Sequence, residues 1–539
     1  MPVDLNLLIG GAAGQGVHAI TLPLAKALMR QGYWVLGVQD YQSRIRGGHL
    51  FNKVRLADRR LFSSREGVDL LIALNQETVT LHQQELSPQG LIIYDAAEVK
   101  ELPGDVPSLA LSPENLLPGA AEKAEIAVNA GACGAVLGLL RVPLAPMLAL
   151  LQETFGGKGA EVVEWNVQAA TKGYEQAGAL AGGLQFICGY PMTPWTSLLN
   201  AIALRAERYN VVVEQAEDEI AAINMAIGAS YAGARALTGT SGGGFCLMTE
   251  ALGLAAVTET PLVIVVSMRP GPSTGLPTRT EQGDLSFVLY ASQGDSPRAV
   301  LAPGTPAQGF ALTAKALNWA DRYQLPVIIL TDQYFGDTQF THTPGEFPEV
   351  QVDRALTTGP SSGTYERYAY SADGVSPRRV PGFGPDLVVA DSDEHTPDGH
   401  LTEDLAVRVK MHDKRLRKLK GLVQEMGGIT TAGDRDAALT LICWGSSLGP
   451  VQEAVARLEG EKTPARMVHL SELWPFPAGP VAAALKGSKK LVMIEMNASG
   501  QLNHLLRQET GIKVDHLVLK YDGAPFTPEY ILRGLSGMV

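Results

Sequence analysis

Short apolar runs alternate with helix-length segments along most of the chain. In the first third these runs are LNLLIGG, WVLGVQ, LLIALN and LIIYD, and later ones include LQFICGYP, NVVVEQ, PLVIVVSM and PVIILTD. Such runs, separated by helical stretches, are typical of parallel strands covered by crossover helices. We therefore predict an α/β fold.

The alternation is interrupted once, and this interruption suggests the domain organisation. Between about 339 and 397 Pro, Gly, Ser and Thr accumulate, as in THTPGEFPEV and GVSPRRVPGFGPD, which is the composition of loops. A charged helix, EDLAVRVKMHDKRLRKLKGLV, follows, and LTLICWGSS, ARMVHL and KLVMIEMN begin a last α/β unit. We predict domains at 1–177, 178–340 and 431–539, with a loop-rich segment and a basic helix at 341–430.

Composition narrows the class of partner. The 539 residues are enough for about three domains. A net charge of -12 argues against nucleic acid and anionic lipid as ligands.

No basic region precedes the first apolar run, and no run approaches the ~18 residues that span a bilayer, so we expect a cytoplasmic protein without a membrane segment. The cysteines stand singly, without C-x-x-C spacing, and we expect four buried thiols and no metal site: Cys133, Cys188, Cys246 and Cys443.

A glycine turn near the start is a candidate anion site. Gly11, Gly14 and Gly16 lie between a predicted strand and a predicted helix, where backbone N–H groups can hold a phosphate. The order G-x-x-G-x-G differs from the dinucleotide fingerprint G-x-G-x-x-G, although Asp40 ends the next strand as the ribose-binding acid does. A nicotinamide dehydrogenase therefore stays open, as does a turn without a ligand.

Downstream, QSRIRGGH sets Arg44, Arg46 and His49 around a Gly-Gly pair. Two guanidinium groups beside exposed backbone suit an anionic group. Surface loops also carry arginines without such a role, so both interpretations are kept.

The stretch EQAEDEIAAINMAIGASYAG places acids at the edge of an apolar helix. Glu219 shares a helical face with Ile223, Ala226 and Ile227, so its carboxylate points where water is scarce and is a strong hydrogen-bond partner for a ligand nitrogen. The alternative is a helix N-terminus lined with acids that complement its dipole, which alone accounts for the acids at 217–218.

This region resembles the alpha subunit of the thiamine diphosphate-dependent 2-oxoacid:ferredoxin oxidoreductases, above all the 2-oxoglutarate type. The resemblance covers nearly the whole chain, because GGAAGQGV and RGGH of the first third resemble the family's gamma domain, fused ahead of the alpha portion. It implies a gamma-type Rossmann-like domain, a pyrimidine-binding domain and a C-terminal transketolase-like α/β domain. The motifs of the alpha portion are GYPMTP, EDEIAAINMAIGAS, TSGGG, RPGPSTGLPTRTEQGDL and EMNASGQL.

The resemblance also implies roles for individual residues. In this family a glutamate matching Glu219 hydrogen-bonds the aminopyrimidine ring of thiamine, Thr193 would bind the substrate's carboxylate and 2-oxo group, and Arg269 would place a positive charge near the same carboxylate. The other expected contacts are Pro191, Thr240, Ser241 and Gly242 for the cofactor, and Ser273, Thr274 and Arg279 for the substrate.

Arg279 is the candidate partner for a second substrate carboxylate. The distal acid of 2-oxoglutarate needs a buried cation, which a guanidinium provides in bidentate fashion. A salt bridge at the rim of the site is the alternative.

The chain departs from the family pattern at four positions that the motifs place around the presumed pocket: Trp195, Gly243, Pro270 and Gln293. These departures leave a branched-chain or aromatic 2-oxoacid open as the substrate.

The sequence predicts a partner chain, because none of its Gly-Asp pairs is followed by the second glycine of the G-D-G magnesium motif. The resemblance implies a beta subunit that carries Mg²⁺ and a [4Fe-4S] cluster, an (alpha-beta)2 assembly, ferredoxin as electron acceptor and coenzyme A as co-substrate. Gly14, Gly16 and Arg46 are candidate coenzyme A contacts. A non-catalytic scaffold or acceptor-binding subunit is the rival interpretation. His395 and His400 suggest a polar loop rather than a metal site.

Overall fold

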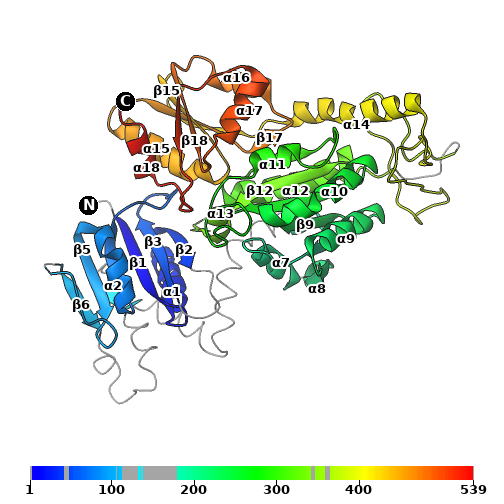
Figure 1. Cartoon of the computed structure of the whole chain (residues 1–539). Helices are drawn as coiled ribbons and strands as arrows, with labels where there is room; N and C mark the ends of the chain where they lie inside the picture. Colours follow the sequence, from blue (N-terminus) through cyan, green and yellow to red (C-terminus); the bar gives the residue numbers. More distant parts are fainter. Residues whose placement is uncertain are drawn as a thin grey trace. The chain divides into compact units, whose positions relative to one another are not determined.

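The computed structural model describes residues 3–41, 48–104, 106–111, 132–133, 135–137, 179–204, 206–341, 346–357 and 364–537 (Figure 1). The chain divides into two compact units. The first comprises Met1–Thr171, Asp337–Thr343 and Thr527–Ser536, and the second comprises Lys172–Gly336, Pro344–Phe526 and Gly537–Val539. Each unit combines helices with a sheet that contains adjacent parallel strands, which confirms the predicted α/β class.

The first unit contains a mixed sheet in its described part, with the order β13-β2-β3-β1-β4-β5-β6. Strand β3 runs antiparallel to both β1 and β2 and was not predicted, because polar residues interrupt its apolar pattern. These polar side chains are buried with hydrogen-bond partners: Arg55 pairs with Asp4, and Asn52 donates to Thr21. The elements are β1 (Asp4–Ala12), α1 (Val17–Arg30), β2 (Trp34–Tyr41), β3 (His49–Ala57), β4 (Val68–Ala73), α2 (Gln76–His82), β5 (Leu86–Asp95), β6 (Ser108–Leu111), β13 (Gln339–Phe340) and α18 (Pro528–Gly534).

The second unit carries a sheet with the order β17-β11-β12-β10-β9-β7-β8, in which only β17 is antiparallel to its neighbour among the described strands. Its elements are β7 (Phe186–Gly189), α7 (Thr196–Ala203), α8 (Ala206–Tyr209), β8 (Val212–Gln215), α9 (Glu219–Tyr231), β9 (Ala236–Thr240), α10 (Gly242–Val257), β10 (Leu262–Met268), α11 (Leu285–Tyr290), β11 (Ala299–Leu301), α12 (Pro306–Tyr323), β12 (Pro326–Asp332), α13 (Gln333–Asp337) and β17 (Glu472–Trp474).

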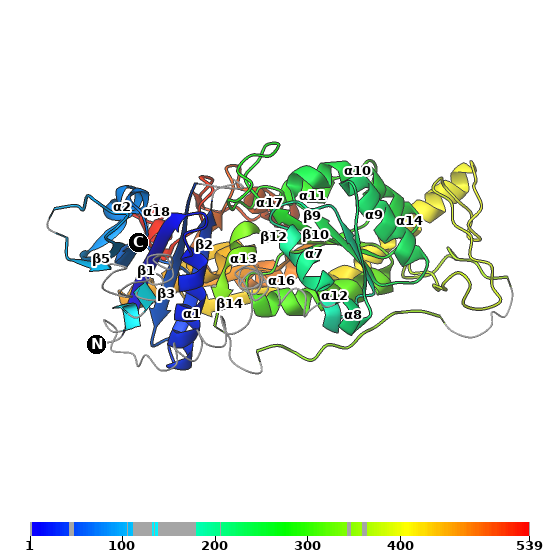
Figure 2. The same cartoon turned by 90° about the horizontal axis from the view of Figure 1, so that it is seen from below.

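The period-2 alternation of strand β10 divides the core of this unit between the two faces of the sheet. Ile264 and Val266 join the cluster that includes α9 and α10, whereas Val263 and Val265 join the cluster that includes α7 and α12. Figure 2 shows α9, α10 and α11 on one side of the sheet and α8 and α12 on the other. Buried strands with apolar residues on both faces explain why the sequence shows continuous runs here.

The same unit contains a second sheet, with the order β14-β16-β15-β18-β19. Its residues Ile442, Trp444 and Met493 belong to the same hydrophobic cluster as α9 and α10, so the two sheets share one core. The elements are α14 (Leu405–Glu425), β14 (Ile429–Gly433), β15 (Leu439–Trp444), α15 (Leu448–Gly460), β16 (Ala465–Leu470), α16 (Ala478–Leu485), β18 (Lys490–Glu495), α17 (Gln501–Thr510) and β19 (His516–Leu519).

Candidate active site

The predicted site residues follow the carboxyl ends of four parallel strands of the second unit. Strand β7 leads into GYPMTP, β8 into the acidic turn before α9, β9 into Ser241, and β10 into Arg269. Ligands of open α/β sheets bind outside this edge, since the loops there are the ones free to vary. The topology therefore brings together motifs that are about 80 residues apart in the chain.

Glu219 is the buried acid of the α9 stretch. Its side chain is only 3% exposed, whereas Glu214 and Glu217 are exposed. Asp218 is the N-cap of α9, because its carboxylate accepts a hydrogen bond of 2.7 Å from the Ala221 N–H. The two interpretations of this acidic stretch thus apply to different residues: a helix cap at 218 and a dry carboxylate at 219.

The first turn of α10 consists of three glycines, and two of them face carboxylates. A Cβ on Gly244 would lie 2.3 Å from Glu219 Oε1 and 2.0 Å from Thr240 Oγ1. A Cβ on Gly242 would lie 2.3 Å from Asp284 Oδ2. Only glycine permits such close approach, so this turn holds one acid on each side.

Ser241, at the N-cap of α10, is buried, and its Oγ has no hydrogen-bond partner among the described residues. Thr240 is likewise buried and donates to Glu219 Oε1 at 3.4 Å. Pro191 is half-buried in the loop after β7. The residues predicted to contact the cofactor thus lie along one edge of the sheet.

Arg269 and Thr193 lie next to each other. Arg269 Nη1 donates to the Thr193 backbone carbonyl at 2.8 Å, while Arg269 Nε is buried without a partner in the described part of the chain. Burial lowers the pKa of Arg269, and the nearby carboxylate of Asp284 opposes this effect. A guanidinium held at one end has a further N–H available for a ligand.

The loop after Arg269 carries the predicted substrate contacts. Ser273 and Thr274 are exposed, and Gly275 has a positive φ of 54° in a turn where a Cβ would collide with the Pro270 carbonyl. Arg279 is half-buried, and its Cβ would lie 3.1 Å from a Cβ on Gly523.

Two acids of this loop, Asp284 and Glu281, were missed by the sequence analysis. Burial raises the pKa of Asp284 to about 6, and Arg269 partly offsets the rise. Burial, together with repulsion from Asp284, raises the pKa of Glu281 to about 7. The only signal in the sequence was their place inside the motif RPGPSTGLPTRTEQGDL, because nothing local indicates that an acid after Gly283 is buried.

The four departures from the family pattern do not all lie at this edge. Gly243 faces the Ser273 carbonyl, and Pro270 directly follows Arg269. Trp195, in contrast, is 0% exposed in the core, where it lies against Gly189 and Gly239. Gln293 lies near Gly253, about 16 Å along α10 from Gly242. The expectation that all four cluster around the pocket is therefore wrong, because two of the side chains point elsewhere.

The candidates of the first unit are only partly described. Gly14 and Gly16 form a turn with φ values of 104° and 75° at the carboxyl end of β1. His49 is buried, and its Nε2 lies 2.8 Å from His82 Nε2. Arg44 and Arg46 lie outside the described residues. The anion-binding hypothesis for this turn stays a prediction.

The cysteine expectation needs one correction. Cys133, Cys188 and Cys443 are buried, but Cys246 is exposed on α10. Among the predicted loop histidines, His395 packs against the Tyr368 ring with centroids 4.0 Å apart, and His400 is exposed. In the described residues no group of three or more metal-ligating side chains is assembled, and no helix there is long and apolar enough to cross a membrane.

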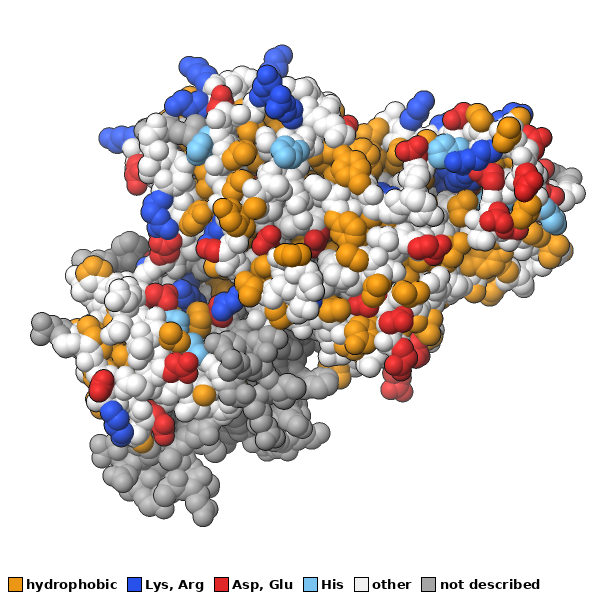
Figure 3. All heavy atoms as spheres, viewed as in Figure 1, with side chains coloured by type: hydrophobic (Ala, Val, Ile, Leu, Met, Phe, Trp, Pro, Cys, Tyr) orange, Lys and Arg blue, Asp and Glu red, His pale blue; other side chains and the backbone are white. Residues whose placement is uncertain are grey.

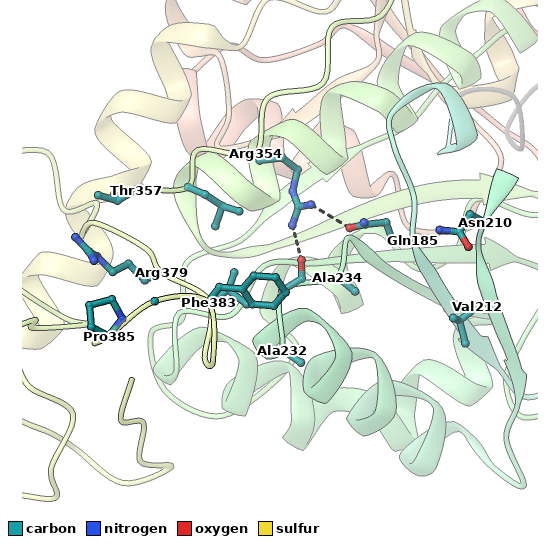
Figure 4. A pocket seen from close by; sticks show the side chains of 14 residues that line it. Gln185, Asn210, Val212, Ala232, Ala234, Arg354, Thr357, Arg379, Phe383 and Pro385 are labelled. Carbon is teal, nitrogen blue, oxygen red and sulfur yellow. Dashed lines mark hydrogen bonds between the residues drawn. The ribbon is translucent and has the colours of Figure 1, made fainter. Parts of the chain in front are cut away.

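A cavity of about 950 Å³ lies elsewhere in the second unit (Figure 4). It lies near the amino ends of β8 and β9, and Asn210, Val212 and Ala234 are among its lining residues. Its Arg354 already donates to Gln185 Oε1 at 3.0 Å and to the Gly233 carbonyl. No predicted site residue lines this cavity, and it lies at the edge of the sheet opposite to the site.

Comparison with known proteins identifies the family of this chain. The alpha subunit of 2-oxoacid:ferredoxin oxidoreductase 2 from Aeropyrum pernix is 31% identical over 97% of this chain and 96% of its own length. The chain belongs to the 2-oxoacid:ferredoxin oxidoreductase alpha-subunit family. It is an alpha subunit of a thiamine diphosphate-dependent oxidoreductase, with a gamma-type portion fused at its start.

Three family models match this alpha subunit in succession. They describe a pyruvate ferredoxin/flavodoxin oxidoreductase (residues 6–176), the thiamine diphosphate-binding part of pyruvate flavodoxin/ferredoxin oxidoreductase (177–414) and core domain II of pyruvate:ferredoxin oxidoreductase (437–531). The 2-oxoglutarate synthase subunit KorA of Methanothermobacter marburgensis is 33% identical over 67% of this chain and 96% of its own.

A solved structure is similar over the full length. It is the 2-oxoglutarate:ferredoxin oxidoreductase from Magnetococcus marinus with 2-oxoglutarate, coenzyme A and succinyl-CoA bound, which is 30% identical, covers 98% of each chain and has a TM-score of 0.89.

Proposed function

We propose that this subunit binds the aminopyrimidine half of thiamine diphosphate at the carboxyl edge of the β7–β10 strands, with Glu219 as the hydrogen-bond partner of the ring. The single observation that carries this proposal is the burial of the Glu219 carboxylate at the first turn of α10. The buried Ser241 Oγ and Arg269 Nε, which have no partner among the described residues, suit a polar ligand at the same edge. These residues therefore fit the cofactor.

When bound, thiamine diphosphate supplies a nucleophilic carbon that attacks a 2-oxo group and accepts the electron pair as carbon dioxide leaves. Glu219 accepts a hydrogen bond from a ring nitrogen and holds the proton there, and its dry surroundings strengthen that bond. Arg269 and the Thr193 hydroxyl orient the 2-oxoacid, with the guanidinium beside the carboxylate that is lost. Thr240 fixes the position of Glu219.

The substrate we propose is 2-oxoglutarate, converted with coenzyme A to succinyl-CoA. Arg279 would pair with its distal carboxylate, and the exposed Ser273 and Thr274 would donate hydrogen bonds from the same loop. The ligands named for the Magnetococcus marinus structure support this choice. Relatives named only as 2-oxoacid enzymes keep a branched-chain or aromatic 2-oxoacid as the second candidate.

The proposal includes a beta subunit that holds the diphosphate half of the site with Mg²⁺ and the [4Fe-4S] cluster, two alpha-beta pairs per cytoplasmic assembly, and ferredoxin as acceptor. Exposed apolar side chains next to the site, Ile220 and Met225 on α9 and Leu247 on α10, favour a protein partner there. Figure 3 shows hydrophobic side chains on this face of the second unit. The coenzyme A candidates stay Gly14, Gly16 and Arg46.

The test is the Glu219→Gln variant in the complex with its beta subunit. We expect thiamine diphosphate to bind more weakly by calorimetry, and dye reduction with coenzyme A and a 2-oxoacid to fall by about 10²-fold or more, because the neutral amide has no negative charge to hold the proton on the ring nitrogen. Glu217→Gln, an exposed acid two residues earlier, is the matched control and should behave as the wild type. Full activity in Glu219→Gln would favour a non-catalytic scaffold. Assaying 2-oxoglutarate against pyruvate, branched-chain and aromatic 2-oxoacids decides the substrate.

A further inference from the structure

The loop that carries Asp284 is clamped by the late motif EMNASGQL. The Gln282 N–H donates to the Met496 carbonyl at 2.7 Å, and the Met496 N–H donates back to Gln282 Oε1 at 3.2 Å. Asn497 Nδ2 donates to the Gln282 carbonyl at 3.2 Å. Two segments more than 200 residues apart are thus joined as closely as paired strands.

Gln501 completes the clamp on the other side of Asp284. Its Nε2 donates to the Gly283 carbonyl at 2.7 Å, and its Oε1 accepts from the Ser286 N–H at 2.9 Å. The motif itself is held by Glu495, a buried carboxylate that accepts from the Leu502 N–H and Asn503 N–H. The backbone on both sides of Asp284 is therefore fixed, and so is the position of its side chain.

The fixed carboxyl group lies against the first turn of α10 and within the field of Arg269. Asp284 Oδ2 and Arg269 Nε are both buried, and neither atom has a hydrogen-bond partner among the described residues. The charged group that acts on Asp284 is Arg269, at the end of β10, and Asp284 in turn acts on Glu281, on its own loop. The α10 turn contributes the neutral Ser241 and Gly242, and the clamp contributes the neutral Gln501.

We propose that Asp284 is a positioning residue that controls how strongly Arg269 holds the carboxylate of the 2-oxoacid, an inference that rests on the proposed function. An ionised Asp284 offsets part of the positive charge of Arg269. The carboxylate of an entering 2-oxoacid therefore competes with Asp284 for the same cation. A proton on Asp284 removes this competition. Binding of the 2-oxoacid therefore draws a proton from solvent onto Asp284, and loss of carbon dioxide returns it.

The direction of the pH effect follows from this linkage. Without substrate the pKa of Asp284 is about 6, and an anion on Arg269 raises it further. Affinity for the 2-oxoacid is then greatest below pH 6 and falls as pH rises from the lower pKa to the higher one. A rise of one pKa unit on binding corresponds to a tenfold loss of affinity in total, from well below the lower pKa to well above the higher one.

The experiment compares wild type and Asp284→Asn in the complex with the beta subunit and thiamine diphosphate. With a one-unit rise in pKa on binding, we expect kcat/KM for 2-oxoglutarate to fall about fivefold in the wild type between pH 6 and 8, mainly through KM, and less than twofold in the variant. Asp295→Asn, a carboxyl group that is 84% exposed, is the matched control and keeps the wild-type profile. If Asp284 is the group responsible, the Glu281→Gln variant shows the same fall in kcat/KM with pH as the wild type.

A second measurement needs neither turnover nor a variant. Calorimetric titration of the wild-type complex with oxamate, in two buffers of different ionisation enthalpy, counts the protons taken up on binding. Uptake of a fraction of a proton near pH 7 supports the inference. An Asp284→Asn profile that matches the wild type, or oxamate binding without proton uptake, overturns it. If no 2-oxoacid is oxidised at any pH, the proposed function fails, and this inference with it.

Discussion

Missing side-chain atoms are what allow two acids of the site and a buried aromatic ring of the core to lie where they do. Gly242 admits Asp284, Gly244 admits Glu219, and Gly239 admits the Trp195 ring, which would lie 2.3 Å from a Cβ at that position. In each case the neighbour is buried or nearly so and has no room to withdraw. The glycines of TSGGG therefore shape the surroundings of both acids rather than merely starting a helix.

The Gly244→Ala variant tests whether the missing Cβ at this position is what makes room for Glu219. The added methyl group would overlap Glu219 Oε1 and Thr240 Oγ1, so we expect a loss of about 1–3 kcal/mol in the free energy of unfolding and at least tenfold weaker thiamine diphosphate binding. Urea denaturation and calorimetry measure the two effects. Gly243→Ala is the control, since its nearest neighbour would be the Ser273 carbonyl at 3.6 Å and alanine favours the helix. Equal behaviour of the two variants would contradict the prediction.

Among the elements, α14 is attached to the site-bearing unit by buried charges. Lys414 Nζ lies 2.7 Å from Glu259 Oε1, and Lys418 pairs with the other oxygen of the same carboxylate. All three side chains are fully buried. Because Glu259 lies between α10 and β10, this ion-pair cluster connects the basic helix to the elements that position Arg269.

Glu259→Gln leaves both lysines buried without their carboxylate, so we expect a loss of about 3–5 kcal/mol in the free energy of unfolding near neutral pH. The pKa of Lys418 is already lowered to about 7 by burial, and removing the carboxylate lowers it further. The unfolded chain then binds more protons than the folded one up to pH ~10, so the stability of the variant should increase as pH rises from 7 to 10. Urea titrations at several pH values measure this, with exposed Glu403→Gln as control. Stability that falls over this range would refute the argument.

How much the sequence predicted differs from element to element. The parallel strands and α9 were predictable, because buried strands leave apolar runs and a capped helix leaves a period of 3.6 residues. Strand β3 was not, since Asn52 and Arg55 look exposed until their partners are known. The clamp on Asp284 was not predictable either, because residues 282 and 501 meet only in the folded chain. Glu219 was predictable because the apolar residues on its helical face are close in the sequence, whereas its contacts with Thr240 and Gly244 form only in the folded chain.

On the scale of the whole molecule, the first unit is built from three separate pieces of chain. After its main portion, residues 337–343 return as β13 beside β2, and residues 527–536 return as α18. Helix α18 buries Ile531 and Leu535, and its Arg533 donates to Glu66 at 2.6 and 2.8 Å. Residues 527–536 are therefore part of the fold of the first unit.

Ending the chain at Phe526 tests this architecture. We expect faster amide hydrogen exchange in the first unit around Glu66, because its contacts with Thr527, Glu529 and Arg533 are lost, and unchanged protection in β10 and β12 of the second unit. Arg533→Ala is the control: its side chain is 61% exposed, so losing the pair with Glu66 should cost less than about 1 kcal/mol and leave exchange nearly unaltered. Uniformly faster exchange in both units would mean that the two unfold together, and unchanged exchange around Glu66 would mean that α18 contributes nothing to the first unit.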